Sequence, residues 1–325
     1  MFAEVALGKG GILFPIFFNS NFTSKSSVLN PSISIGEDGT GTFVFRRTNY
    51  RYLRPVKNLP SLTSTGSIQY LRTGTEAISS TFFLAQFDFS SSHLNKVQTI
   101  KIDKTYNPVL PIQTKFDYST LEDLRICSIN EKFTFLGNIA TAENMRRPFY
   151  FEIDKFEKNQ DHFSLVNEQI IENSYMSKCE KNWLPIERRY GEFVRWPLAV
   201  KKSEKKFAEV ISIFRSDSLS ADFGEHPKVY GGSQFVLYED GYIAVIHFKE
   251  DGYRKNTHRY LHQFFYYDKN LEFVKSSKPF TFLGFDTEFC SGIAVYSDTI
   301  YVSFSCNDSL NFVLSFNSSA LIWDT

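Results

Sequence analysis

The chain has 325 residues, 42% of them hydrophobic, so it can bury a sizeable core in one large domain or two ordinary ones. Its 36 acidic and 36 basic residues give a formal net charge of zero, which removes any global electrostatic case for binding nucleic acid or an anionic membrane. Any anion site must therefore be a local cluster of cations. The apolar run 12–18 contains Pro15 and is too short to span a bilayer, so a cytoplasmic protein without a membrane span is expected.

Aromatic side chains dominate the apolar composition, with 34 Phe and 17 Tyr, and they suit the pleated surface of a β-sheet. Short alternating apolar runs recur almost from end to end, separated by turns rich in Gly, Asp, Asn and Ser. These runs are residues 42–45, 80–87, 133–138, 207–214, 234–238, 242–248, 260–267, 292–296 and 299–305. They predict an all-β fold, and Pro148 interrupts the single helical candidate around Glu143–Asn159.

Five turn motifs each precede two or more of the predicted strands. They begin at Asn30, Leu121, Lys181, Gly231 and Glu288. Apart from the first gap, they lie roughly 50 to 60 residues apart, about the length of a four-stranded propeller blade. The spacing favours a five-bladed β-propeller in which residues 1–325 form a single domain. The inner strands of a propeller start around one channel, so we expect an active site there.

The segment Leu121–Arg125 places two carboxylates and a guanidinium where a strand begins. Adjacent carboxylates beside an Arg have different environments, which can separate their pKa values into an acid and a base or ligand. Solvated turns have the same composition, so the segment alone leaves both interpretations open.

The four cysteines are Cys127, Cys179, Cys290 and Cys306. They are widely spaced, and each lies in or beside a strand-like run. This pattern predicts buried apolar thiols rather than a zinc site or disulfides. No Gly-rich phosphate loop, HExxH or GxSxG motif occurs, and we expect no metal and no cofactor.

A basic cluster lies within residues 253–262. It consists of Arg254, Lys255, His258, Arg259 and His262. It either binds an anionic group at the rim of the channel or is a solvated hairpin loop. If a strand begins near His258, alternation puts His258, Tyr260 and His262 on one face and Arg259 on the other.

Taken in order, the motifs resemble the five-bladed propeller enzymes of glycoside hydrolase family 130 and the related β-1,2-mannosyltransferases. The matching segments are Asn30–Ile33 with Phe43–Arg47, Leu121–Arg125, Lys181–Pro185 with Val194–Pro197, Gly232–Ser233 with Ala244–His247, and Glu288–Gly292 with Val302–Asp308. Leu124 stands where the family usually has proline, and Trp183 and Trp196 replace the residues expected near the basic motifs.

The resemblance implies inverting glycosyl transfer with Asp123 as the general acid. It also implies a phosphate or donor site formed by Arg125, Lys181, Arg195 and His247. The basic cluster of residues 253–262 adds His258 and Arg259 to this predicted site. The implied sugar-binding residues are Asn30, Arg46, Glu122, Asn182, Trp183, Glu288 and Asp308. For Trp183, packing between blades is an alternative to stacking on a sugar ring.

The expected activity is transfer of a mannose-like sugar between a phosphorylated or nucleotide-sugar donor and a glycan acceptor, with the nucleotide donor preferred. A glycoside phosphorylase or hydrolase of the same fold is the alternative. A hydrolase needs a second carboxylate, Glu122 or Glu288, roughly 6.5–9.5 Å from the acid. A non-catalytic glycan-binding propeller is the second alternative, because a fold does not determine its function.

Overall fold

The computed structural model describes residues 1–18, 26–53, 69–72, 79–89, 93–100, 120–129, 132–140, 146–154, 162–163, 165–171, 181–189, 191–195, 198–201, 209–213, 229–251, 258–285 and 287–324. These segments are mostly β-strand, with a short helix α1 (Phe2–Gly8) and a 3-10 turn at Ser318–Ala320. Within them, no helix is long and apolar enough to cross a membrane. The predicted all-β class is confirmed.

Three sheets contain thirteen of the described strands between β2 and β16. The first has the order β11 (His162–Phe163), β7 (His93–Ile100), β6 (Ser80–Asp88), β3 (Gly41–Thr48), β2 (Ser27–Ile35). The second has the order β12 (Val166–Ile170), β10 (Arg146–Asp154), β9 (Lys132–Ala140), β8 (Glu122–Ile129). The third has the order β13 (Trp183–Pro185), β14 (Glu192–Arg195), β15 (Leu198–Lys201), β16 (Glu209–Ile213). Neighbouring strands are antiparallel except β11 and β7.

Two further sheets follow, together with a separate hairpin. The fourth sheet has the order β17 (Val229–Gly231), β19 (Gly241–Asp251), β20 (His258–Tyr267), β21 (Phe273–Ser276), and β18 (Val236–Tyr238) also pairs with β19. The fifth has the order β22 (Glu288–Tyr296), β23 (Thr299–Cys306), β24 (Leu310–Asn317), β1 (Ile12–Ile16). The hairpin is β4 (Tyr50–Leu53) with β5 (Gln69–Arg72). The N-terminal strand β1 thus completes the last sheet.

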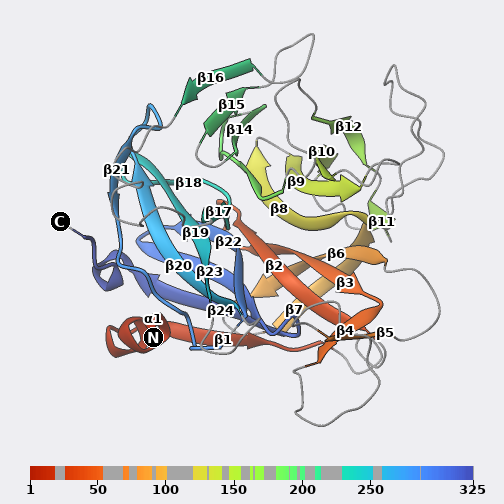
Figure 1. The fold of residues 1–325 in the computed structure, drawn as a ribbon, viewed down its shortest axis with the longest axis horizontal. Coiled ribbons are helices and arrows are strands. Elements are labelled where there is room, and N and C mark those ends of the chain that lie inside the picture. The colour runs from red at the N-terminus through yellow and green to blue at the C-terminus, as the bar shows by residue number, and fades with distance from the viewer. Residues whose placement is uncertain are drawn as a thin grey trace.

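The five larger sheets of the described chain follow one another around a common centre (Figure 1). Each predicted turn motif lies within or directly before the first strand of one of them. Strand β2 contacts both β8 and β22. At the centre, the buried Gln234 side chain donates from Nε2 to the carbonyls of Ile33 (2.5 Å) and Ile293 (2.7 Å). One amide in the connection between β17 and β18 therefore ties strands β2 and β22 of two other sheets together, and it satisfies carbonyl groups whose burial would otherwise be costly.

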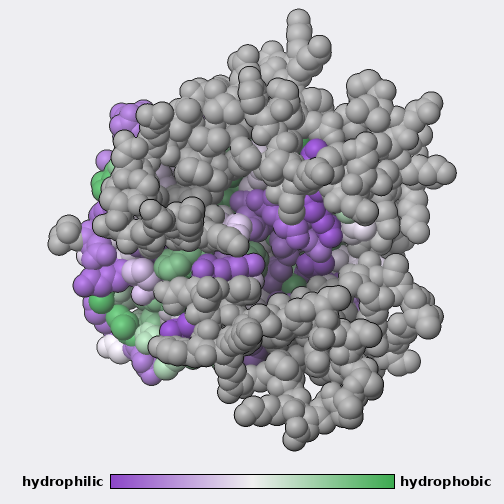
Figure 2. All heavy atoms as spheres, viewed as in Figure 1, coloured by the Kyte–Doolittle hydropathy of each residue, from purple (hydrophilic) through white to green (hydrophobic). Residues whose placement is uncertain are grey.

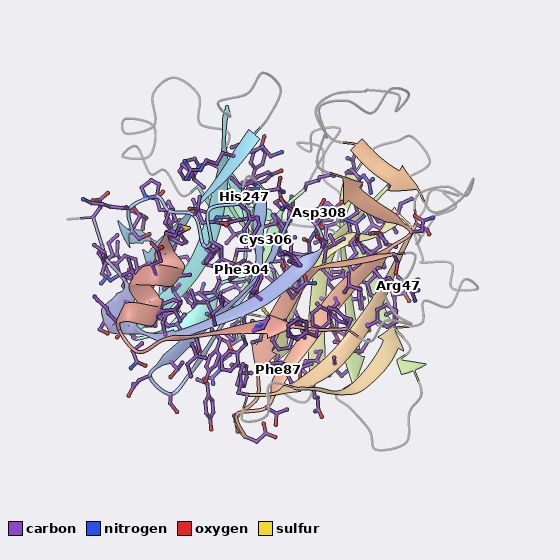
Figure 3. The ribbon with its side chains drawn as sticks, turned by 90° about the horizontal axis from the view of Figure 1, so that it is seen from below. Arg47, Phe87, His247, Phe304, Cys306 and Asp308 are labelled. Atoms are coloured by element: carbon purple, nitrogen blue, oxygen red, sulfur yellow. The ribbon has the colours of Figure 1, made fainter. Side chains whose placement is uncertain are left out.

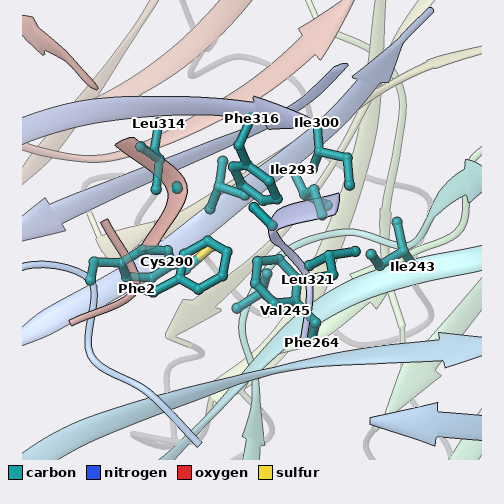
Figure 4. Close-up of a cluster of buried hydrophobic side chains, with 14 of the residues drawn as sticks. Phe2, Ile243, Val245, Phe264, Cys290, Ile293, Ile300, Leu314, Phe316 and Leu321 are labelled. Carbon is teal, nitrogen blue, oxygen red and sulfur yellow. The ribbon is translucent and has the colours of Figure 1, made fainter. Parts of the chain in front are cut away.

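The core consists of apolar layers between neighbouring sheets. Successive residues of β19 point to opposite faces, so Ile243 and Val245 pack toward the fifth sheet while Ala244 and Ile246 pack toward the third. Phe2 of α1 joins the first of these layers, with its ring 5.0 Å from that of Phe316 (Figure 4). Because both faces of the sheet are buried, the alternating runs were strongly hydrophobic as well as periodic.

Three cysteines behave as the sequence predicted. Cys127, Cys290 and Cys306 are unbridged and buried, and burial raises the pKa of each thiol. Cys179 lies outside the described residues.

Candidate active site

Asp123 lies at the start of β8 in a conformation that directs its side chain away from the regular ladder. Its φ is 54°, and the pairing of β8 with β9 is irregular between Glu122 and Arg125. Asp is one of the few non-glycine residues that tolerate this left-handed conformation, and such bulges re-aim side chains. The predicted acid therefore sits at a bulge at the beginning of an inner strand.

Two residues from the first sheet hold the Asp123 carboxylate. Asn30 Nδ2 donates to Asp123 Oδ1 at 2.7 Å, and Arg46 Nη1 donates to the same oxygen at 3.3 Å. Asn30 also has a positive φ, 53°, and its Oδ1 accepts from Ser305 of the fifth sheet at 2.9 Å. Three sheets therefore fix one carboxylate, and residues between 77 and 275 positions apart in the sequence meet there.

Glu122 is the centre of a cluster of cations beside Asp123. Its Oε1 accepts from Arg46 (3.0 Å) and Arg146 (3.4 Å), and its Oε2 accepts from Lys181 (3.0 Å). The Lys181 side chain remains 38% exposed. Because Arg46 also donates to Asp123, three cations face two carboxylates here, and the excess of one positive charge favours an anionic ligand.

Arg125 is committed to protein oxygens. Its Nε donates to the carbonyl of Gly232 and its Nη1 to the carbonyl of Asp123, both at 2.7 Å, while Nη2 donates to Asn182 Oδ1 at 3.3 Å. The side chain is 1% exposed, and burial lowers its pKa to about 10. These contacts position the Asp123 backbone. A direct contact between Arg125 and phosphate stays a prediction.

The environments of Asp123 and Asp308 move their pKa values in opposite directions. For Asp123, burial favours the neutral form, but the charges of Arg46, Arg125 and Lys181 and the hydrogen bond from Asn30 outweigh it and lower the pKa. For Asp308, burial together with the negative charges of Asp123 and Glu122 exceeds the attraction of Arg46 and raises the pKa to about 6. Carboxyl groups with divergent pKa values can divide acid and base roles between them.

Asp308 reaches this site from the turn between β23 and β24. Asn307 (φ 51°) and Asp308 (φ 48°) occupy the centre of that turn, closed by the Ser309 N–H on the Cys306 carbonyl at 3.2 Å. Two positive φ values in succession are characteristic of a type I′ turn, where Asn and Asp are favoured. The sequence assigned Asp308 to sugar binding and missed its coupling to Asp123. Figure 2 shows hydrophilic side chains gathered around a hollow near the middle of the face that is turned toward the viewer.

His247 is not the cation that the sequence predicted. The ring is 2% exposed and stacks with Tyr230 and Tyr260, with centroids 5.5 Å apart in both cases. Burial lowers its pKa well below 6.5, and the charges of His262, Arg125 and Lys249 add to that effect. A neutral, enclosed imidazole supplies no charge to a phosphate, and a contact between His247 and a bound anion stays a prediction.

Trp183 and Glu288 also lie in the interior. Trp183 is 2% exposed and packs with Leu136, Tyr150 and Phe193, which favours the packing alternative over stacking on a sugar. Glu288 is fully buried, and its carboxylate accepts the backbone N–H groups of residues 282 (2.6 Å), 283 (2.8 Å) and 285 (2.9 Å). The carboxylate organises a loop, so the expected sugar contact and base role of Glu288 are corrected.

We expect Glu288→Ala to destabilise the protein by about 2–4 kcal/mol, because it leaves three N–H donors without their acceptor. Chemical denaturation measures the loss. Exchanging the exposed Asp298 for Ala is the control and should leave the free energy of unfolding nearly unchanged. An equally small effect at both positions would contradict the structural role of Glu288.

The remaining predicted residues divide by position. Asn182 borders the site with a φ of 61° and accepts from Arg125. Arg259 pairs with Glu250 in the register of β19 and β20, whereas Tyr260 pairs with Lys249, so the predicted alternation is confirmed. Arg195 and His258 lie in β14 and β20, and their side chains are outside what the structure describes.

Some residues of the site carried no sequence signal. Arg146 belongs to β10, a region where the sequence left room for a helix, and Ser305 reads as an ordinary strand residue. Only the ring of sheets brings them to Glu122 and Asn30.

Comparisons with known proteins support the architecture. No protein-family model and no curated protein matches the sequence. Among solved structures, one similar chain comes from the GH130 family of mannoside phosphorylases, which is described as containing glycoside hydrolases that target β-1,2-mannosidic linkages in Candida mannan. Its TM-score is 0.57 at 14% identity, and the match covers 90% of this chain and 85% of that chain. The β-1,2-mannobiose phosphorylase of Listeria innocua, in complex with β-1,2-mannobiose, has a TM-score of 0.54 at 13% identity, covering 94% and 97%.

A glycosyl hydrolase from Bacteroides ovatus has a TM-score of 0.54 at 13% identity, covering 90% of this chain and 85% of that chain. At such identities the likeness establishes the fold alone. The distant resemblance that the ordered motifs indicated is confirmed at that level.

Proposed function

We propose that this protein is a carbohydrate-active enzyme on a five-bladed β-propeller, which transfers a mannose-like sugar with inversion between a glycan and a phosphate-bearing partner. The mannoside phosphorylases and glycoside hydrolases that share its fold support the substrate class. The preferred partner is inorganic phosphate or a sugar 1-phosphate, because phosphorylases are among those folds. This replaces the nucleotide sugar that the sequence favoured.

The observation that carries the proposal is the Asp123 carboxylate held among an excess of cations. In the unliganded site its pKa is lowered, so Asp123 is ionised at neutral pH and has no proton to donate. An incoming phosphate dianion would offset the charges of Arg46 and Lys181 and raise that pKa. Binding the anionic substrate would therefore load the acid, which couples proton donation to the presence of phosphate.

The reaction then follows directly. A phosphate oxygen attacks the anomeric carbon and forms the new C–O bond, while the glycosidic C–O bond breaks on the opposite face. The Asp123 proton moves to the departing glycan oxygen, and the phosphate group of the product or solvent restores it. No second carboxylate is needed, because phosphate is already a competent nucleophile.

A hydrolase is the second candidate, and Asp308 favours it. A partly buried carboxyl group with a pKa of about 6 next to the acid has the properties of a base that activates water. It takes the place of Glu288, whose oxygens are engaged with backbone N–H groups.

A donor screen tests the proposal. The purified protein is offered mannose 1-phosphate, a mannose nucleotide or no donor, together with simple mannosides, and release of phosphate, nucleotide or free mannose is followed. Phosphate release from mannose 1-phosphate is the expected result. Free mannose without any phosphate would establish the hydrolase, and nucleotide release the transferase. Binding of mannosides without any turnover would instead indicate the non-catalytic propeller.

A further inference from the structure

One face of the fourth sheet becomes polar at the end of its strands that lies nearer the candidate active site. The register pairs Tyr230 with His247, His247 with His262, and Lys249 with Tyr260, so all five side chains share that face. Further along β19 the same face contributes Val245 to the core. His247 lies on the same side of the molecule as Asp308, away from Phe87 (Figure 3). The polar end of this face therefore borders the candidate site.

Lys249, Tyr230 and Tyr260 form a compact group on this face, here called the tyrosine shelf. The Lys249 ammonium lies 5.5 Å from the centroid of the Tyr230 ring and 5.2 Å from that of Tyr260. All three side chains are partly exposed, while His247, whose ring stacks with both tyrosines, is buried. Phenol rings fixed on a sheet present both an apolar surface and a hydroxyl group, and the ammonium adds a positive charge.

Buried nitrogen atoms without a partner lie beside the shelf on the same face of the sheet. Among the residues that the structure describes, His247 Nδ1 and both ring nitrogens of His262 find no hydrogen-bond partner, and the two ring centroids are 6.3 Å apart. Native interiors rarely leave such atoms unsatisfied, so they indicate a place where a water molecule or a ligand group binds. This observation is independent of the aromatic contacts.

The tyrosine shelf is separated from Asp123 by a short series of ring contacts. The Arg125 guanidinium, which donates to the Asp123 carbonyl, lies 5.7 Å from the centroid of the Phe289 ring. The centroid of the Phe289 ring in turn lies 5.1 Å from that of His247, which stacks with both tyrosines of the shelf. A group bound on the shelf is therefore close to the reacting centre but beyond its immediate contacts.

We propose that Tyr230, Lys249 and Tyr260 form a distal subsite for a saccharide residue that carries an anionic substituent such as phosphate. The inference rests on the proposed function, since it places an acceptor residue next to the reacting one. The exposed parts of the two tyrosine rings contact the sugar, and the phenol hydroxyls and the ammonium bind the anion. The position of the shelf beyond Phe289 assigns the anion to a carbon remote from the bond being made.

Isothermal titration with mannose 6-phosphate, mannose 1-phosphate, mannose and inorganic phosphate tests this subsite. We expect Lys249→Gln to weaken mannose 6-phosphate binding about tenfold, the effect of one charged hydrogen bond, and to leave mannose and mannose 1-phosphate unchanged. Tyr260→Phe removes only a hydroxyl and should weaken the same ligand to a smaller degree.

The matched control is Lys275→Gln, since Lys275 lies over Tyr266 at 5.0 Å and Trp323 at 4.7 Å on the outer part of the same sheet. It should leave every affinity unchanged. Equal loss of mannose 1-phosphate or inorganic phosphate in Lys249→Gln would assign Lys249 to the donor site and overturn the distal subsite. Absence of mannose 6-phosphate binding to the wild-type protein would also overturn the distal subsite. Because titration needs no turnover, either result is distinct from a failed donor screen.

Discussion

Asp123→Asn is expected to lower turnover by about 10²- to 10⁴-fold, the contribution of a positioned general acid, while sugar binding is unchanged. The amide oxygen can still accept from Asn30 Nδ2 and Arg46 Nη1, so the local geometry is retained. What the variant lacks is a proton to donate to the departing oxygen. Steady-state kinetics with the donor identified in the screen, combined with titration of the sugar, separates the two effects.

Asp298→Asn is the matched control, because Asp298 is an exposed turn residue between β22 and β23. It should retain full turnover. An Asp123→Asn enzyme as fast as the wild type would remove Asp123 from the chemistry. If the variant instead loses sugar binding and thermal stability together, Asp123 is a structural residue that ties β8 to Asn30 and Arg46.

The fold was largely predictable, because its physical causes are local. The run 242–248 lies within β19 (Gly241–Asp251), and the run 299–305 lies within β23 (Thr299–Cys306). Alternation and turn residues act over a few positions, so they can be read from one segment at a time. The helix α1 (Phe2–Gly8) was not predicted, since seven residues are too few to show a helical period and α1 is held by Phe2 packing.

The site was predicted less completely, because its chemistry depends on contacts between distant segments. A carboxylate in a motif can bind a sugar or act as a base, as expected for Glu288, or can accept three backbone N–H groups, as the structure has it. A Trp can stack on a sugar or fill a layer between sheets, as Trp183 does. No pattern near Asp308 in the sequence indicates its raised pKa, which depends on burial in the folded site and on the charges of Asp123 and Glu122, nearly two hundred positions away.

Asp308→Asn is expected to make the protein more stable and less active at neutral pH. In the folded state the pKa of Asp308 is raised from 3.8 to about 6, so the folded protein retains a proton that the unfolded chain releases between these values. Stability contributed by the neutral form is present at pH 4 and is lost as pH rises through 6. Because the carboxyl group is partly exposed, we expect the Asn variant to gain about 1–2 kcal/mol above pH 6 and nothing near pH 4.

The same charge acts on the acid. Removing Asp308 takes a negative charge away from Asp123, which lowers the pKa of Asp123 further, so less of the acid is protonated at pH 7. Turnover at pH 7 should fall about tenfold for each unit by which the pKa of Asp123 falls, and the alkaline limb of the pH–rate profile should move to lower pH.

Chemical denaturation at pH 4 and pH 7.5, together with pH–rate profiles of the wild-type protein and the variant, checks the effects on stability and on activity. Because a misfolded variant loses stability and activity together, a gain in stability with a displaced alkaline limb identifies Asp308 as the electrostatic partner of the acid. A profile that falls uniformly without displacement would instead assign Asp308 to sugar binding alone.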